Sequence, residues 1–578
     1  MQLALRSGVT VRLSADYVWM AAAADVLFAV SAVLVLMALG RWRPAWAGAG
    51  AVLGVLSALL VLCVVLQAES LHRGAVLLLA VGTGSQVAWL ARYPRVRRLF
   101  VLVPPTSFAM AALVAYWGVS THRATARAEA AAMAALPAPP AEAMNVLLLI
   151  LDTVREQSTG LGNPALDSTP ALDAFARQGV AFDWAIAPAP WTLPSHASFF
   201  TGHPPNQVSA NWGIPLDRQF PTLAEYLGQK GYLTAGFVGN LQFATRASGL
   251  ARGFLHYDDF QVNLGQLLLS SNLGRALAGA DWLRRVLGHH ELLNRRTAAD
   301  VTDDFLAWQA RSAGRPFFAF VNFFDAHEPY FPAGRSGSFL WPGPRWTRYE
   351  HEVGLHSGAN AWIAEKWTLS PEQVKIHAGA YERAVSKADV QVGRLLGELT
   401  RRGVLANTLV IIAGDHGEQV GEHRLFEHIN SLYLPALRVP LVIASPRIPR
   451  AARVPEAVSL TDLPATVVDL LGLSAGAPFP GRSLAAHWTT PGGADTAFSM
   501  LKRGLVRQGW YPIGRGSEMY SLTTSEHHYI RNGDKTEELY DLRRDPEESR
   551  NLVADPGSGP ALERLRGTLS RMLGRPAP

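Results

Sequence analysis

The stretch NVLLLILDTVR, residues 145–155, indicates the fold class of this chain. Six apolar residues follow Asn145 without interruption, and such a run indicates a strand buried on both faces of a parallel sheet. Asp152 comes directly after this strand. We therefore expect it at the carboxyl edge of the sheet, where open α/β folds bind their ligands.

A second strand ends in the same way in NTLVIIAGDHGE, residues 407–418. The apolar run stops at Gly414, and Asp415 and His416 follow at once. Two strands that deliver two carboxylates and an imidazole to one edge would form a divalent-metal site. A single aspartate after a strand is more often a helix cap, so the predicted metal site depends on Asp152, Asp415 and His416 acting together.

The segment APWTLPSHASFFTG, residues 189–202, is predicted to carry the nucleophile. Pro194 suits the first turn of a helix, which would place Thr192 just before a helix N-terminus that favours negative charge. A threonine hydroxyl attacks poorly until a base or a metal activates it, and a cation at the predicted metal site could do so. The alternative is that Thr192 only caps the helix.

Two further histidines follow apolar segments near the presumed site. His327 lies in NFFDAHEPY and His428 in FEHINSLY. Imidazoles at strand exits could hold substrate oxygens or protonate a leaving group, so both are predicted to be catalytic and substrate-binding residues. The alternative is that they make only structural hydrogen bonds.

After Met144, short apolar runs alternate with helix-like segments, as at residues 317–323 and 381–402. This alternation predicts an α/β sandwich with a central, largely parallel sheet covered on both faces. The last part of the chain is more broken, with strand-like segments at 527–532 and 538–542. We expect it to form a small C-terminal subdomain.

Four long apolar stretches occupy the N-terminal region, at residues 17–39, 45–67, 74–91 and 99–120. Each approaches the ~20 residues that a helix needs to cross the hydrocarbon core. We therefore predict a multi-pass integral membrane protein with the lipid bilayer as a partner. The arginines are densest in the short loops between these stretches, which favours those loops in the cytoplasm. The catalytic domain would then lie outside the cytoplasm, in the periplasm or the extracellular space.

The predicted organisation has four units in chain order. They are a helical transmembrane region (1–123), an Ala- and Pro-rich linker (124–143), a catalytic domain (144–490) and the C-terminal subdomain (491–578).

The net charge of +6 belongs entirely to the N-terminal part of the chain. The first 143 residues hold eleven arginines and five acidic residues, and the remainder is neutral. A neutral main body without a basic tract argues against a nucleic-acid partner. The only cysteine, Cys63, excludes an intrachain disulfide and lies far from the predicted nucleophile.

Taken together, the motifs from about Asn145 to Leu552 resemble the sulfatase family of the alkaline phosphatase superfamily. Further motifs appear in the order typical of that family: TPALDAFARQGVAF, FPTLAEYLGQKGYLTAGFVGN, YERAVSKADVQVGRLLGEL, SLTDLPATVVDLLG and ELYDLRRDPEESRNL. The resemblance implies a metal held by Asp152, Thr192, Asp415 and His416, with Thr192 as the nucleophile. It also implies substrate contacts from His196, His327 and His428.

Two departures from the family pattern bear on the chemistry. Sulfatases carry cysteine or serine, oxidised to formylglycine and followed by x-Pro-x-Arg, whereas here the string runs from Thr192 to His196. Oxidation of threonine would give a ketone, so the formylglycine aldehyde cannot form. Asp152 is followed by Thr153 rather than by a second acid. This site is similar to those of lipoteichoic acid synthases and lipid A phosphoethanolamine transferases.

The sequence thus predicts a membrane-anchored hydrolase or transferase that acts on phosphate esters of lipids or envelope polymers. Its cofactor would be a divalent ion such as Mn, Zn, Mg or Ca. Two alternatives stay open: a sulfuric ester hydrolase that works without formylglycine, and an inactive membrane scaffold.

Overall fold

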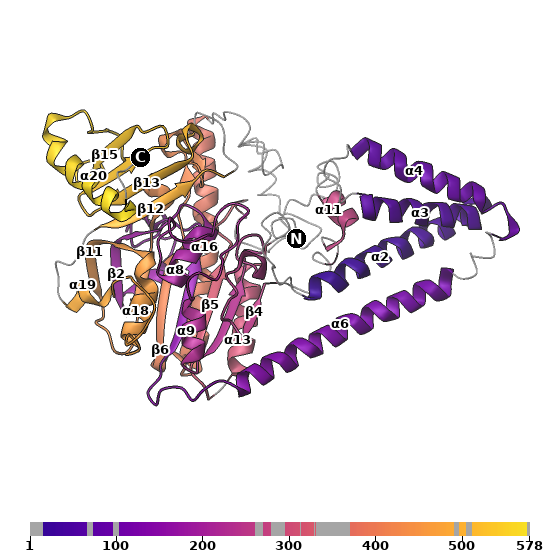
Figure 1. Ribbon diagram of the computed structural model, residues 1–578, viewed down its shortest axis with the longest axis horizontal. Helices are drawn as coiled ribbons and strands as arrows, with labels where there is room; N and C mark the ends of the chain where they lie inside the picture. Colours follow the sequence, from indigo (N-terminus) through magenta and orange to yellow (C-terminus); the bar gives the residue numbers. More distant parts are fainter. Residues whose placement is uncertain are drawn as a thin grey trace.

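The computed structural model describes most of the chain, and it separates a helical N-terminal part from an α/β part (Figure 1). The described residues are 15–65, 73–95, 103–259, 267, 270–278, 295–312, 314–328, 330, 370–489, 496–504 and 511–574.

A large sheet forms the centre of the α/β part, in the strand order β11-β2-β10-β6-β1-β5-β3-β4, with β9 paired to β2. β1 is parallel to both of its neighbours, β5 and β6, whereas β10 runs antiparallel to β6 and β2. The predicted largely parallel sheet is therefore confirmed. The strands are β1 (Asn145–Leu151), β2 (Val180–Ile186), β3 (Leu233–Val238), β4 (His256–Asp258), β5 (Phe317–Phe323), β6 (Thr408–Gly414), β9 (Arg438–Val439), β10 (Leu441–Ala444) and β11 (Ala452–Ser459).

Both faces of β1 are buried, as its unbroken apolar run predicts. Val146, Leu148 and Ile150 belong to one core cluster, and Leu147 and Leu149 belong to the other. Alternate side chains of a strand point to opposite faces, so a strand covered on both sides must be apolar throughout. The helices of the α/β part are α7 (Pro170–Ala176), α8 (Thr192–Thr201), α9 (Leu223–Gln229), α13 (Ala298–Arg311), α16 (Pro371–Arg401), α17 (Leu434–Leu437), α18 (Leu463–Leu470) and α19 (Ala485–Thr489). A short helix, α11 (Asn272–Ala278), lies instead beside the N-terminal helices (Figure 1), where the Asn272 amide donates to the Cys63 carbonyl at 2.9 Å.

The C-terminal region contains a second, antiparallel sheet in the order β12-β13-β14-β15. Its strands enclose a separate core against helix α20 (Gly559–Leu573), with Leu522, Leu539 and Leu565 among the buried side chains. β14 and β15 coincide with the two strands predicted in this region. The strands are β12 (Ala497–Lys502), β13 (Glu518–Thr523), β14 (His527–Arg531) and β15 (Glu537–Asp541), and a short hairpin of β7 (Gln419–Val420) and β8 (Phe426–Glu427) lies in the catalytic region.

Four helices correspond to the four predicted membrane spans, but the prediction of a multi-pass protein is not supported. Within the described residues, only Trp19–Gly40 is long and apolar enough to cross a membrane. It belongs to α2, and the described parts of the next two apolar helices, Ala49–Val65 and Gly74–Leu90, are shorter than the ~20 residues needed. The fourth stretch begins a long helix whose second half is polar. The four helices are α2 (Ala15–Gly40), α3 (Ala49–Val65), α4 (Arg73–Leu90) and α6 (Val103–Ala134).

Helix α6 connects the N-terminal helices to the α/β part (Figure 1). Near its end, Glu129 lies against His256 of β4, with 3.2 Å between Oε1 and Nδ1. Arg315 then donates hydrogen bonds to the carbonyl oxygens of Leu136 and Pro137. The predicted linker is thus helical as far as Ala134, and the segment after it packs on the α/β part.

Candidate active site

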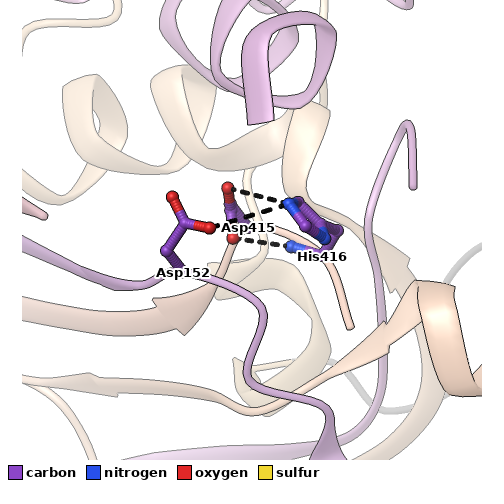
Figure 2. Close-up of side chains that lie close together, drawn as sticks. All are labelled: Asp152, Asp415 and His416. Carbon is purple, nitrogen blue, oxygen red and sulfur yellow. Dashed lines mark hydrogen bonds and ion pairs between the residues drawn. The ribbon is translucent and has the colours of Figure 1, made fainter. Parts of the chain in front are cut away.

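The two aspartates of the predicted metal site lie side by side because of the strand order. Asp152 follows β1 and Asp415 follows β6, and these strands are parallel neighbours with Leu151 paired to Gly414. His416 completes a cluster in which one ligand atom from each residue lies within 4.8 Å of the others. Figure 2 shows both carboxylates pointing toward the imidazole.

Thr192 joins this cluster at the start of α8. Its Oγ1 lies 3.4 Å from Nε2 of His416, and that nitrogen is 3.5 Å from Oδ2 of Asp415. Oδ1 of Asp152 is 3.8 Å from the same nitrogen. All four side chains are buried. The structure therefore brings together the four residues that the sequence predicts as metal ligands.

These residues fit a divalent cation. Asp152 Oδ1 and Asp415 Oδ2 are buried, and neither has a hydrogen-bond partner among the described residues. Burial raises the pKa of Asp415 to about 8, and burial together with the charge of Asp415 raises that of Asp152 well above its usual range. Two buried carboxylates that each leave one oxygen without a donor are costly unless positive charge offsets them. The His416 Nδ1–H donates to the Gly417 carbonyl at 3.0 Å, which leaves Nε2 as the ligand atom.

The contacts of Thr192 argue against a capping role. α8 begins at Thr192 itself, and the residue in the N-cap position is Trp191. The Thr192 hydroxyl approaches His416 and Asn240, with Nδ2 of Asn240 at 3.3 Å. Ser195, one turn further on, donates to the Asp415 carbonyl at 2.6 Å and so ties α8 to the strand exit.

Two asparagines at the same sheet edge have no assigned role in the sequence predictions. Asn240 lies just beyond β3, and its Nδ2 donates to Oδ2 of Asp152 at 3.0 Å. Asn322, within β5, donates to the same oxygen at 3.3 Å and accepts a hydrogen bond from the Asn240 N–H. Both asparagines occur where an apolar strand ends, which is the signal that identified Asp152 and Asp415.

His196 lies beneath the site rather than at its surface. Its Nδ1–H donates to the carbonyl of Thr192 at 2.8 Å, and its ring packs against Phe199 and Phe320. Burial lowers the pKa of His196 to about 3, so the imidazole is neutral. The side chain is entirely buried, and the contact of His196 with substrate stays a prediction.

His327 and His428 lie next to the cluster. The ring centre of His428 is 4.5 Å from that of His416 and 5.1 Å from that of His327. Burial lowers the pKa of His428 to about 4 and that of His327 well below its ordinary value, so both rings are neutral. The Nδ1–H of His327 donates to the carbonyl of Glu328 at 2.8 Å. Three adjacent imidazoles thus line one side of the aspartate pair.

Comparisons with known proteins match most of this chain to sulfatases. A family model described as "Sulfatase" matches residues 144–473, and one described as "N-sulphoglucosamine sulphohydrolase, C-terminal" matches residues 421–574. Arylsulfatase K of Rattus norvegicus is 24% identical over 446 residues, which cover 72% of this chain and 76% of that protein. N-sulphoglucosamine sulphohydrolase of Homo sapiens is 26% identical over 503 residues, covering 74% and 89%.

The fold is also similar to that of a solved structure, the phosphonate monoester hydrolase of Agrobacterium radiobacter. The TM-score is 0.55 at 21% identity, and the match covers 75% of this chain and 95% of the other. At this identity the likeness shows the fold alone. Because the first family model spans more than half of the chain, this protein belongs to the sulfatase family.

Proposed function

We propose that this protein is a metal-dependent ester hydrolase or transferase that attacks phosphate esters with Thr192. One observation carries the proposal: the Thr192 hydroxyl lies against His416 Nε2 and Asn240 Nδ2, next to two buried carboxylate oxygens that lack donors in the described part of the chain. A nucleophile, a helix N-terminus that favours negative charge and a set of metal ligands thus lie next to one another.

Each residue then has a definable task. A cation held by Asp152, Asp415 and His416 would favour the alkoxide of Thr192 and offset the charge of the ester. Asn240 fixes Asp152 and the Thr192 oxygen by its amide hydrogens. Backbone N–H groups at the start of α8 favour the negative substrate. His327 and His428 hold the remaining oxygens, and the neutral imidazole of His428 can take up the proton that Thr192 loses and return it to the leaving group.

The reaction balances as two displacements. The Thr192 oxygen forms a bond to phosphorus, and the bond from phosphorus to the ester oxygen breaks. The proton that the Thr192 hydroxyl loses passes to the departing oxygen, which leaves as an alcohol. Water or a second alcohol then attacks the threonine ester and restores the hydroxyl, which gives hydrolysis or transfer respectively.

A second candidate is sulfate-ester hydrolysis. The names of the curated relatives, among them arylsulfatase K and N-sulphoglucosamine sulphohydrolase, favour it. Against it stands Thr192, because threonine cannot form the aldehyde hydrate through which formylglycine sulfatases release sulfate. The phosphonate monoester hydrolase with a similar fold is compatible with phosphorus chemistry on this scaffold.

We further propose that the N-terminal helices anchor the enzyme in a membrane and that its substrates are lipids or envelope polymers. Nearly all exposed large apolar side chains that the structure describes lie between Leu27 and Met133. The exceptions are Ile214, Leu277, Val390 and Met572. Such a continuous apolar surface is unfavourable in water and suits a lipid environment.

The test is a substrate screen of the purified full-length chain with Mn, Zn, Mg and Ca. Phosphate diesters, phosphate monoesters and sulfate esters are compared for the wild type, Thr192→Ala and Thr192→Ser. We expect phosphate esters to turn over fastest, Thr192→Ala to be inactive and Thr192→Ser to keep part of the activity. Mass spectrometry of quenched enzyme should place the phosphoryl or headgroup mass on the peptide with Thr192.

Thr201→Ala is the matched control, because Thr201 is a buried threonine of the same helix whose hydroxyl donates to the Ala197 carbonyl and accepts from the His203 N–H, away from the metal ligands. It should cost stability and spare turnover. An active Thr192→Ala enzyme, or an adduct on another residue, contradicts the nucleophile. Faster turnover of sulfate esters supports the second candidate instead.

A further inference from the structure

We infer that Glu418 is a positioning residue that holds His428 in the orientation required at the leaving group. The inference rests on the proposed function, in which His428 contacts the ester. Oε1 of Glu418 accepts a hydrogen bond from Nδ1–H of His428 at 3.1 Å. No role for Glu418 follows from its place in the GDHGE motif, where it lies two residues beyond His416.

The pair has an inner and an outer end. The Glu418 side chain is 0% exposed and that of His428 is 11% exposed, so the carboxylate lies inside and the imidazole lies nearer the surface. With the Nδ1–H of the neutral ring engaged by Glu418, Nε2 on the opposite side is the nitrogen that can take up the Thr192 proton and pass it to the departing oxygen. A carboxylate behind a histidine thus selects both the tautomer and the ring orientation, as in other acid–base dyads.

The loop that carries His428 adopts an unfavourable backbone to reach this position. Glu427 and Ile429, which flank His428, have φ angles of 61° and 63°, and His423 and Arg424 have 51° and 59°. These left-handed conformations are costly for residues with a Cβ and persist where surrounding contacts determine them.

Side-chain hydrogen bonds supply such contacts on both sides of the loop. Arg155 donates to Glu422 Oε1 at 2.7 Å, and the Asn430 amide donates to the Phe426 carbonyl at 2.8 Å. The loop is therefore held in the shape that brings the imidazole onto Glu418.

A second buried pair of the same kind provides a matched control. Nδ1–H of His528, on β14, donates to Glu548 Oε1, and both side chains are buried in the C-terminal region. Glu548 also accepts a hydrogen bond from the Leu434 N–H at 2.7 Å. This pair serves folding alone, so its loss should lower stability without changing the dependence of turnover on the substrate.

The experiment compares the wild type, Glu418→Gln, His428→Ala and Glu548→Gln on two phosphate esters in the full-length, metal-loaded enzyme. One ester releases a simple alcohol, which needs a proton to depart, and the other releases nitrophenolate, which does not. For Glu418→Gln we expect kcat on the alkyl ester to fall about 10–100-fold with little change in KM, and the nitrophenyl ester to be nearly unaffected. The variant with both Glu418→Gln and His428→Ala should be no slower than the variant with His428→Ala alone.

Several outcomes would overturn the inference. An equal loss on both esters, together with a lower metal content, would show that Glu418 acts on the metal site. Additive losses in the double variant would show that Glu418 works independently of His428. A wild type inactive on every ester would refute the proposed function instead. In that case ¹⁵N NMR of labelled histidine still tests the pair, because the His428 signals should indicate the Nδ1–H tautomer and should change in Glu418→Gln but not in Glu548→Gln.

Discussion

Thr192 and His196 stand where the sulfatase family has a modifiable residue and an arginine, and the structure shows how the site accommodates both. A neutral imidazole fills the arginine position, binds the Thr192 carbonyl and packs among phenylalanine rings. Positive charge from this side of the site is therefore absent among the described residues. In the proposed mechanism, charge compensation for the substrate would fall to a cation held by Asp152, Asp415 and His416 and to the helix start.

At the same scale, we expect Asn240→Ala to lower kcat about 100-fold, because it removes the amide donor that holds Asp152 and Thr192. The variant also loses the acceptor for the Phe243 N–H at 2.9 Å, so its stability should fall by about 1–2 kcal/mol. Asn163→Ala is the control for the loss of a local hydrogen bond in a turn, because Asn163 Oδ1 accepts from the Ala165 N–H away from the site. Turnover of phosphate esters and thermal unfolding are measured for both variants. Unchanged turnover of Asn240→Ala would contradict this role.

At the scale of elements, helices α3 and α4 pack through glycines. A Cβ added to Gly84 would lie 2.6 Å from the carbonyl oxygen of Gly54, and one added to Gly54 would lie 2.7 Å from that of Gly84. Small residues at such a contact let two apolar helices approach closely, which is typical of helix pairs in lipid. The hairpin thus has a specific interface although each helix is short for a full span.

We therefore expect Gly84→Leu to destabilise the helical region by about 1–3 kcal/mol through overpacking. Gly82→Leu, on the same helix, is the control because a Cβ there meets nothing within 4 Å. Thermal unfolding of both variants in detergent would measure the difference. Equal melting temperatures for the two would mean that α3 and α4 do not pack as described.

At the scale of the whole molecule, α6 and the linker set the catalytic part relative to the N-terminal helices. The helix has 32 residues and is therefore about 48 Å long. Near its C-terminal end, Glu129 pairs with His256, and just after it Arg315 donates a hydrogen bond to the Pro137 carbonyl. A long helix that docks at its end favours a defined orientation of the active site over a freely moving tether.

The orientation across the membrane can be tested with C-terminal reporters. We expect a reporter enzyme that folds only outside the cytoplasm to be active, as the sequence predicts for the catalytic domain. With α2 as the only span among the described residues, the C-terminus then lies on the same side as Arg41 and Arg43 and opposite to Arg6 and Arg12. A reporter that works only in the cytoplasm is the control and should give no signal. The reverse pattern would refute the predicted orientation and leave the proposed chemistry untouched. Two of the arginines behind the prediction, Arg97 and Arg98, lie outside the described residues.

The sequence alone determined the parallel sheet and the positions of Asp152 and Asp415. The reason is local: an unbroken apolar run forces a doubly buried strand, and the next residue must leave it at the carboxyl edge. Apolar stretches likewise predicted the N-terminal helices, and the described part of α3 runs from Ala49 to Val65 within the predicted stretch 45–67.

Only the tertiary structure decided which distant residues share the site. Asn240 reaches Asp152 because β3 and β5 follow β1 in the sheet, an order that no local pattern contains. Glu418 meets His428 because a strained loop folds back between β7 and α17. His196 turns inward because phenylalanines from α8 and β5 enclose it. These contacts depend on strand order, loop shape and packing, which are properties of the folded chain as a whole.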